Sequence, residues 1–251
     1  MEKGLNTSAK PAGLAACLAI GGSDSCAGAG IQADLRTFAA FGIKGCSAIT
    51  ALTAQNPNTV YRVEPVPLAQ LEAEIRALFD HYDIKAVKTG MLYDAERIEL
   101  VVSLLNELHA DRPVVVDPVM VSSSGKRLLD ESAVTVLEQK LFPVASLITP
   151  NVPEAELLLG EKAGKETSAR LSGKFSTPVL LKGGHIRGDR LLDQLYINGE
   201  EIAFPHERQP WDQEKAHGTG CRLASAIAAS LAKGSSLSVS VAEAIGWLQN
   251  G

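Results

Sequence analysis

The sequence predicts an α/β fold in which helices cover both faces of a mostly parallel sheet. Short, continuous apolar runs alternate along the chain with stripes of apolar residues at helical spacing. Continuous runs are typical of strands that are buried on both faces, as parallel strands are. At 251 residues, with 45% hydrophobic and 21% charged residues, the chain is long enough to bury a full core.

The elements follow one another in a regular order. Residues 14–20 predict the first strand, and Ile31, Leu35 and Phe38 predict a helix that ends at Gly42. Further strands are expected at residues 46–53, 85–88, 113–116, 146–148 and 178–181. The helical stripes between these strands consist of Leu68, Leu71, Ile75, Leu78 and Tyr82, then Ile98, Val101, Val102, Leu105 and Leu108, then Val134, Leu137 and Leu141.

The end of the chain changes its pattern. Asn198-Gly199 lies between two strand-like segments, residues 192–197 and 200–204, which is typical of a β-hairpin. We find no internal repeat and no interdomain linker. The sequence therefore predicts one domain over residues 14–251, preceded by a loose extension of residues 1–13.

Composition excludes several classes of function. The net charge of −5 argues against nucleic acid or an anionic membrane as the main partner. No apolar stretch approaches the roughly 20 residues of a membrane span, and the run 14–20 is too short for a convincing signal peptide. The cysteines show neither a C-x-x-C pair nor zinc-like spacing, so we expect reduced thiols in a cytoplasmic protein; they are Cys17, Cys26, Cys46 and Cys221.

Polar residues follow four of the predicted strands. Asp24 comes shortly after the first strand, and Asp117 directly follows a run of three valines. Asn151 and Lys182 occupy the equivalent positions after the strands at 146–148 and 178–181. Because the carboxyl ends of parallel strands share the edge at which open α/β folds bind ligands, we expect an active-site crevice there.

Each of these residues also has a structural interpretation. Asn151 with Glu154 three residues later fits a capping box, which is compatible with Glu154 reaching a magnesium-bound water. Asp117 can start a turn or be a second acidic group near a metal. Lys182, in a glycine-rich stretch, can be a solvated lysine in a turn.

The most informative segment is His217-Gly218-Thr219-Gly220-Cys221, which precedes an apolar helical run ending at Lys233-Gly234. A glycine turn at a helix N-terminus presents unpaired N–H groups and the positive end of the helix dipole, which together bind anions. The same field is expected to lower the pKa of the Cys221 thiol. The alternative is a close-packed joint with a buried cysteine.

Other phosphate-binding patterns are absent. Gly28-Ala29-Gly30 lacks the Gly-x-Gly-x-x-Gly spacing, and no Gly-x4-Gly-Lys-[Ser/Thr] loop occurs. Nicotinamide and P-loop enzymes are therefore disfavoured. Asp34, in the next helix, is either a solvated residue or directed into the crevice, and periodicity does not decide between them.

Together these segments resemble the hydroxymethylpyrimidine and hydroxymethylpyrimidine-phosphate kinases of thiamine biosynthesis, in the ribokinase-like superfamily. The resemblance implies a ribokinase-like, doubly wound fold and an ATP-dependent kinase that uses Mg²⁺. The matching motifs are Gly21-Gly-Ser-Asp-Ser25, Gly28-Ala-Gly-Ile-Gln-Ala-Asp34, Thr50-Ala-Leu-Thr-Ala-Gln-Asn56, Lys88-Thr-Gly-Met91, Asp117-Pro-Val-Met-Val121, Ser124-Gly125, Thr149-Pro-Asn-Val-Pro-Glu-Ala155, Lys182-Gly-Gly-His185 and His217-Gly-Thr-Gly-Cys221.

The resemblance also implies residue roles. The aminopyrimidine would contact Asp24 and Gln55, in a pocket shaped by Gly22, Met91 and Val119. Magnesium would lie near Asp117 and Glu154. ATP would contact Asn151, Lys182, His217 and Thr219. The catalytic group would comprise Lys182, the anion hole at Gly218 and Gly220, and Cys221, acting on the hydroxymethyl group. Relatives suggest a homodimer whose ligands are the pyrimidine and ATP.

The chain departs from the family pattern at several places. Cys26-Ala27 stands where two glycines are usual, Lys215-Ala216 replaces Asn-Thr, and Arg222 replaces a threonine. The segment 160–177 is several residues shorter than usual.

Three other functions remain open. A pyridoxal kinase of the same superfamily is the nearest. A cysteine-nucleophile transferase or hydrolase would use Cys221 and His217, although no third orienting group is apparent. A non-catalytic sensor would follow from the altered residues on the ATP side.

Overall fold

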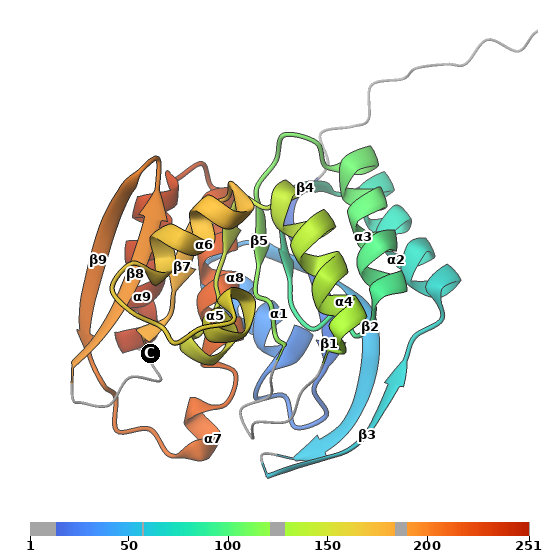
Figure 1. Ribbon diagram of the computed structural model, residues 1–251. Coiled ribbons are helices and arrows are strands. Elements are labelled where there is room, and N and C mark those ends of the chain that lie inside the picture. The colour runs from blue at the N-terminus through green and yellow to red at the C-terminus, as the bar shows by residue number, and fades with distance from the viewer. Residues whose placement is uncertain (1–13, 57, 121–128, 184–189, 251) are drawn as a thin grey trace, which may run out of the picture.

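The computed structural model describes residues 14–56, 58–120, 129–183 and 190–250. Within these ranges, nine strands form one sheet in the order β3-β2-β1-β4-β5-β6-β7-β8-β9 (Figure 1). The extension expected at residues 1–13 lies outside the described residues, as do the motif residues 124–125 and 184–185.

The centre of the sheet is parallel, as the sequence predicts. The antiparallel strands lie at its two sides: β3 (Thr59–Pro65) pairs with β2 at one side, and β8 (Arg190–Ile197) and β9 (Glu200–Glu207) follow β7 at the other. The carboxyl ends of the parallel strands therefore share one edge, the lower one in Figure 1. The parallel strands, in spatial order, are β2 (Lys44–Asn56), β1 (Ala15–Ser23), β4 (Asp83–Thr89), β5 (Val114–Val116), β6 (Leu147–Ile148) and β7 (Val179–Leu181).

Helices cover both faces of the sheet, which confirms that part of the prediction (Figure 1). Alternate residues of each strand point to opposite faces, so Leu18 and Ile20 of β1 pack in one core while Cys17 and Ala19 pack in the other. The first core is covered by α2 (Leu68–His81), α3 (Ala95–Leu108), α4 (Glu131–Val136), α5 (Val152–Leu159) and α6 (Thr167–Phe175), and the second by α1 (Gly30–Ala40), α8 (Thr219–Ala232) and α9 (Leu237–Asn250).

Some elements differ from their predictions. The helix expected around Val134 and Leu141 starts as α4, then widens into a π-helical turn (η1, Leu137–Leu141) and tightens into a 3₁₀ turn (η2, Phe142–Val144). The π-helical turn ends at Leu141, and Pro143, which has no N–H to donate, occupies an early position of the 3₁₀ turn, where no such donor is needed. Strand β3, helices α6 and α9, and the short α7 (Gln213–Ala216) are additional to the predicted set.

The Asn198-Gly199 hairpin is confirmed. Both residues have positive φ angles, 53° and 83°, as a two-residue turn between right-twisted strands requires. The turn joins β8 to β9 at the far side of the sheet from β3.

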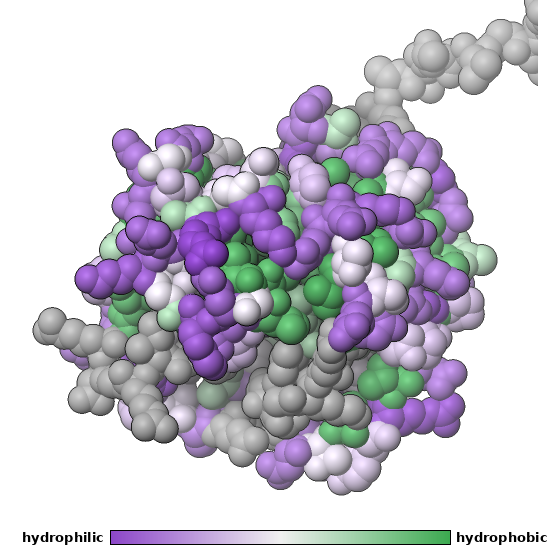
Figure 2. Space-filling model, in the orientation of Figure 1, coloured by the Kyte–Doolittle hydropathy of each residue, from purple (hydrophilic) through white to green (hydrophobic). Residues whose placement is uncertain are grey.

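Hydrophilic residues cover most of the helices on the face shown in Figure 2, with apolar residues visible between them. In the part of the chain that the structure describes, no helix combines the length and apolar character that a membrane span requires.

Candidate active site

The ends of β5 and β7 bring an acid and a lysine together. Asp117 directly follows β5 and Lys182 directly follows β7, and Lys182 Nζ donates to Asp117 Oδ1 at 2.8 Å. The Asp117 side chain is only 5% exposed and that of Lys182 only 14%. Asn151 and Lys182 form a parallel bridge, in the same register as the Ile148–Val179 pair of β6 and β7 and beyond the end of both strands. The residues predicted to line a crevice at this edge thus come from three adjacent strand ends.

Glu154 lies beside this pair as part of a capping box. Asn151 Oδ1 accepts from the backbone N–H of Glu154, and Glu154 Oε2 accepts from the backbone N–H of Asn151, both at 2.9 Å. Glu154 Oε1 accepts a third hydrogen bond from Met120 N at 3.1 Å. Burial raises the pKa of Glu154, and the positive charge of Lys182 opposes that rise. The capping interpretation is confirmed.

The N-terminus of α8 opens onto the same pair. Gly218 caps the helix with a φ of 80°, a conformation that favours glycine. A Cβ atom placed on Gly220 would lie 3.2 Å from Lys182 Nζ and 3.7 Å from Asp117 Oδ2. The absence of a side chain at Gly220 therefore leaves space between the lysine and the helix N-terminus, the arrangement expected of an anion hole.

The expected lowering of the Cys221 pKa is wrong. Burial raises the pKa of this thiol to about 11, because a thiolate would be removed from water. Lys88 and a hydrogen bond from the Gly30 backbone favour the thiolate, whereas Asp117 and Asp34 disfavour it. The helix dipole alone does not decide the pKa, and the resting group is a neutral thiol.

A second group gathers at the end of β1 around Asp24. His217 Nε2 lies 2.9 Å from Asp24 Oδ2, and the backbone N–H groups of Cys26 and Ala29 donate to the same carboxylate at 2.9 and 2.7 Å. Burial opposes ionisation of Asp24, but hydrogen bonds from Cys26, Gln55, Ala29 and His217 outweigh it and lower the pKa well below its usual range. Asp24 is therefore an ionised carboxylate that is only 2% exposed.

Backbone hydrogen bonds between Gln55 and the side chain of Ser25 hold Gln55 next to Asp24. Ser25 Oγ donates to the carbonyl oxygen of Gln55 at 2.8 Å and accepts from its N–H at 2.9 Å. This reciprocal pair ties the end of β2 to the loop after β1. The two predicted pyrimidine contacts, Asp24 and Gln55, are thus neighbours.

The three predicted pocket residues lie around the ends of β1, β4 and β5. A Cβ atom on Gly22 would lie 2.5 Å from Met91 Cε, so the two residues are in direct contact. Thr50 Oγ1 donates to the carbonyl oxygen of Met91 at 2.6 Å and holds that loop. Val119 has a φ of 45°, which is strained for a β-branched residue. Such strain is often found at ligand sites.

A buried ion pair lies beside the first turns of α8. Lys88 Nζ donates to both carboxylate oxygens of Asp34, at 2.8 and 2.9 Å, and Ser225 Oγ donates to Asp34 Oδ1 at 2.8 Å. Lys88 and Asp34 are each 1% exposed. Asp34 is therefore not solvated, and its partner Lys88 was not among the predicted site residues. The position of Lys88 near the carboxyl end of a predicted strand was the sequence signal that could have marked it as a site residue.

His217 and Thr219, the other two predicted nucleotide contacts in this turn, form no hydrogen bond to Lys182 among the described residues. His217 pairs with Asp24, and Thr219 Oγ1 donates to the Ala216 carbonyl at 3.0 Å. Both residues flank Gly218 in the turn that starts α8. Gly218 in turn lies directly against the loop after β1. A Cβ on Gly218 would lie 2.0 Å from the carbonyl oxygen of Gly28. The Asp24 group and the Asp117 group thus meet at one glycine turn.

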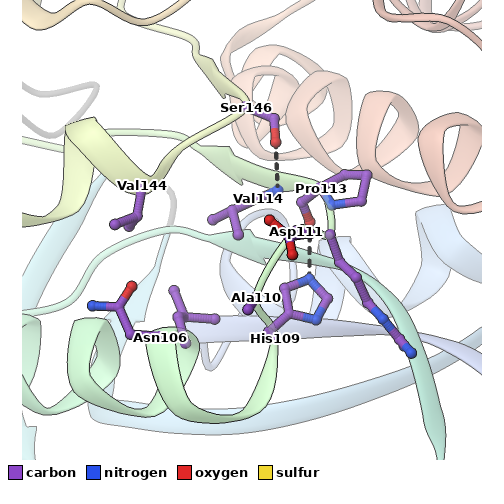
Figure 3. Close-up of a pocket in the computed structure, with 10 residues that line it drawn as sticks. Asn106, His109, Ala110, Asp111, Pro113, Val114, Val144 and Ser146 are labelled. Carbon is purple, nitrogen blue, oxygen red and sulfur yellow. Dashed lines mark hydrogen bonds between the residues drawn. The ribbon is translucent and has the colours of Figure 1, made fainter.

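A cavity of about 500 Å³ lies at the opposite edge of the sheet, around the start of β5 (Figure 3). Its lining groups bond to one another: His109 Nε2 lies 3.2 Å from the Pro113 carbonyl, and Ser146 Oγ accepts from Val114 N at 3.1 Å. None of the sequence-predicted site residues lines it.

A sequence profile of the phosphomethylpyrimidine kinase family matches residues 24–251. The chain belongs to this family. It is 42% identical to a hydroxymethylpyrimidine/phosphomethylpyrimidine kinase of Rhizobium meliloti, an alignment that covers 93% of this chain and 89% of that protein. It is also 45% identical to a bifunctional thiamine biosynthesis protein of Geobacter sulfurreducens, with 90% of this chain aligned to 47% of that longer protein.

Solved structures of family members and their relatives share the fold. A phosphomethylpyrimidine kinase of Clostridium difficile is 36% identical, with a TM-score of 0.82, and covers 94% of this chain and 98% of its own. A pyridoxal kinase of Staphylococcus aureus in complex with pyridoxal is 30% identical, with a TM-score of 0.84, and covers 94% and 86%. The ribokinase-like kinase fold and the phosphomethylpyrimidine kinase resemblance are confirmed.

Proposed function

We propose that this protein transfers the γ-phosphoryl group of ATP to 4-amino-5-hydroxymethyl-2-methylpyrimidine, and then a second one to the resulting monophosphate, in thiamine biosynthesis. The observation that carries this proposal is the meeting of the two residue groups at the N-terminus of α8. One group offers a carboxylate and an amide to an aminopyrimidine, and the other offers a lysine and a helix N-terminus to phosphates.

Phosphoryl transfer passes through a loose, in-line transition state, so the protein contributes mainly position and charge. Lys182 and the backbone N–H groups at the start of α8 stabilise negative charge on the transferring group. Asn151, beside Lys182, extends this surface along the phosphates. His217 and Thr219 belong to the same turn and orient the nucleotide side of it.

The carboxylates of Asp117 and Glu154 fit a magnesium ion. Mg²⁺ prefers oxygen ligands and keeps several of its waters, and here two buried carboxyl groups flank one lysine. Because both Glu154 oxygens accept backbone hydrogen bonds, Glu154 would hold the ion through water. When bound, Mg²⁺ neutralises charge on the phosphates.

We assign Cys221, in the first turn of α8, to the acceptor hydroxyl. Its thiolate, formed when the thiol loses its proton to water, takes the proton of the hydroxymethyl group as the phosphoryl group arrives. The buried Lys88 behind it favours that thiolate.

ADP release from MgATP tests the proposal with four acceptors: hydroxymethylpyrimidine, its monophosphate, pyridoxal and ribose. We expect the pyrimidine and its monophosphate to be the best acceptors and activity to require a divalent cation. Equal or faster turnover of ribose would refute the proposed substrate. Turnover of an acceptor without ATP, with covalent labelling of Cys221, would favour a cysteine-nucleophile mechanism instead.

Pyridoxal is a second candidate acceptor. The pyridoxal-bound kinase of Staphylococcus aureus shares the fold at 30% identity. Pyridoxal also carries a hydroxymethyl group on an aromatic nitrogen ring. The assay above ranks the two acceptors directly by kcat/KM.

A further inference from the structure

Three side chains of types that bind metal ions lie close together at the loop after β1. Asp24, Cys26 and His217 each present one ligand atom, and these atoms all lie within 4.8 Å of one another. Cys26 Sγ is 3.0 Å from Asp24 Oδ1, and His217 Nε2 is 2.9 Å from Asp24 Oδ2. The carboxylate thus stands between a thiol and an imidazole.

The surroundings fix two of these ligands. The Asp24 carboxylate accepts two backbone hydrogen bonds, and its own N–H donates to Gln32 Oε1 at 2.9 Å. The His217 ring packs against Gly28, where an added Cβ would lie 2.4 Å from His217 Cδ2. Cys26 is exposed, so its side chain can adjust and an ion can enter from solvent.

The chemistry of the three ligands selects the class of ion. Thiolate, imidazole and carboxylate together are ligands of Zn²⁺ and similar transition metals, whereas Mg²⁺ takes oxygen ligands. Tetrahedral zinc with bonds of about 2.0–2.3 Å places its ligand atoms about 3.3–3.6 Å apart. The Cys26–Asp24 contact would lengthen by about half an ångström, which rotation of the exposed Cys26 side chain supplies, and the His217–Asp24 contact would lengthen by a similar amount.

We propose that Asp24, Cys26 and His217 form a binding site for one zinc-class divalent ion, separate from the magnesium site at Asp117 and Glu154. The Cys26 thiol gives up its proton to solvent as the metal–sulfur bond forms, and a water completes the four ligands. This inference goes beyond the proposed kinase function and does not depend on it.

Metal binding to the full chain, without nucleotide or acceptor, tests the site. We expect one equivalent of Co²⁺ to give a near-ultraviolet thiolate-to-cobalt band, and one equivalent of Zn²⁺ to bind in calorimetry with Mg²⁺ in excess. Cys26→Ser should abolish the band and weaken Zn²⁺ binding at least about 100-fold, since even indirect ligand changes cost 10–100-fold. His217→Gln should keep the cobalt–sulfur band but weaken binding.

Two cysteine variants serve as controls. Cys46→Ser removes a thiol from β2, and Cys221→Ala removes the thiol of the anion hole; both should keep the band and the affinity. Absence of the band in the unaltered protein would overturn the proposal. So would a change in Zn²⁺ affinity below about tenfold in Cys26→Ser, or a band that is lost in Cys221→Ala and kept in Cys26→Ser.

Discussion

At the scale of the residue, Cys221 shows how two effects compete on one thiol. The start of α8 and the nearby Lys88 favour its thiolate, but burial dominates and raises the pKa to about 11. At neutral pH the group is therefore protonated. If the thiolate is the form that accepts the substrate proton, its small population limits the rate.

This assignment makes the pH dependence of the reaction a test of Cys221. Below a pKa of about 11, the thiolate fraction rises tenfold per pH unit, so kcat should rise with pH between roughly 7 and 10. Cys221→Ala should lower kcat by roughly 10²–10⁴-fold and remove this slope. Cys221→Asp should recover part of the rate with a flat profile, because its carboxylate is ionised throughout. A near-native, still sloping profile in Cys221→Ala would make the cysteine a packing residue.

Gln55 provides a test of the acceptor side. Its amide can pair with the edge of an aminopyrimidine. We expect Gln55→Ala to raise the KM for the pyrimidine about five- to 150-fold, the effect of losing one buried hydrogen bond of about 1–3 kcal/mol. The KM for ATP, measured with the same variant, should change little. An unchanged pyrimidine KM would remove Gln55 from the site.

The residues that could be predicted from the sequence are those whose neighbours in the chain define their place. Asp117 follows three valines and therefore had to lie at the carboxyl edge, and Asn151 and Glu154 carry their capping box in four residues. The Asp34–Lys88 pair could not be predicted, because its members are 54 positions apart and only the tertiary fold brings α1 and β4 together at this point. The Cys221 pKa was mispredicted for the same reason, since burial is not visible in a local motif.

At the scale of the element, the β8–β9 hairpin is tied to the active site by a chain of polar contacts. Asp193 Oδ1 accepts from the N–H of Gly183, directly after Lys182, at 2.7 Å. The other oxygen of Asp193 lies 3.2 Å from His206 Nε2 on β9. Gln249 of α9 contacts the other ring nitrogen of His206 at 3.1 Å. The hairpin therefore supports the position of the lysine loop.

His206 makes this support depend on pH. The hydrogen bond with Asp193 raises its pKa above the ordinary value, so the protonated imidazole is favoured in the folded state. Its contribution is fully present below the unfolded pKa of about 6.5 and is lost as the pH rises through the folded pKa.

Urea unfolding at pH 6 and pH 8 measures this contribution. We expect the wild-type protein to lose of order 1 kcal/mol more stability over this range than His206→Gln, a typical value for a charged hydrogen bond. His81→Gln removes an exposed histidine at the end of α2 and should behave like the wild type. Equal losses in wild type and His206→Gln would contradict the assignment.

The helices and strands with the clearest hydrophobic patterns were the ones that could be predicted from the sequence. Helices α1, α2 and α3 have apolar stripes and most of the parallel strands have apolar runs, and the structure contains all of them. Strand β3 carries exposed residues such as Tyr61 among polar neighbours, so it lacks a clear signal. The π-helical turn before Pro143 depends on packing around Leu141 and Phe142, which the sequence alone does not reveal.

At the scale of the whole molecule, the site depends on one contact between distant parts of the chain. Gly218 lies so close to Gly28 and Ala29 that a Cβ would fall 2.0 Å from the Gly28 carbonyl oxygen and 2.8 Å from Ala29 Cα. Backbone atoms cannot move aside as a flexible side chain does. Gly218 therefore sets the separation between the loop after β1 and the start of α8.

Gly218→Ala should separate those two segments. We expect it to lower stability by at least about 2 kcal/mol through backbone strain and overlap, and to lower kcat/KM for the acceptor more than tenfold. Gly234→Ala is the matched control: its φ is 90°, but nothing lies within 4 Å of the added Cβ. It should cost about 1–2 kcal/mol in urea unfolding and leave kcat/KM unchanged. Equal kinetics for the two variants would show that the contact does not position the site.

The contact between Gly28 and Gly218 also bears on how the enzyme is made. Every strand of the described sheet precedes residue 208, yet the anion hole begins at residue 218. A nascent chain thus completes its sheet before α8 is available to dock against the first loop. Ligands that span this junction hold the loop after β1 and the start of α8 together and stabilise the finished fold over any partly synthesised form.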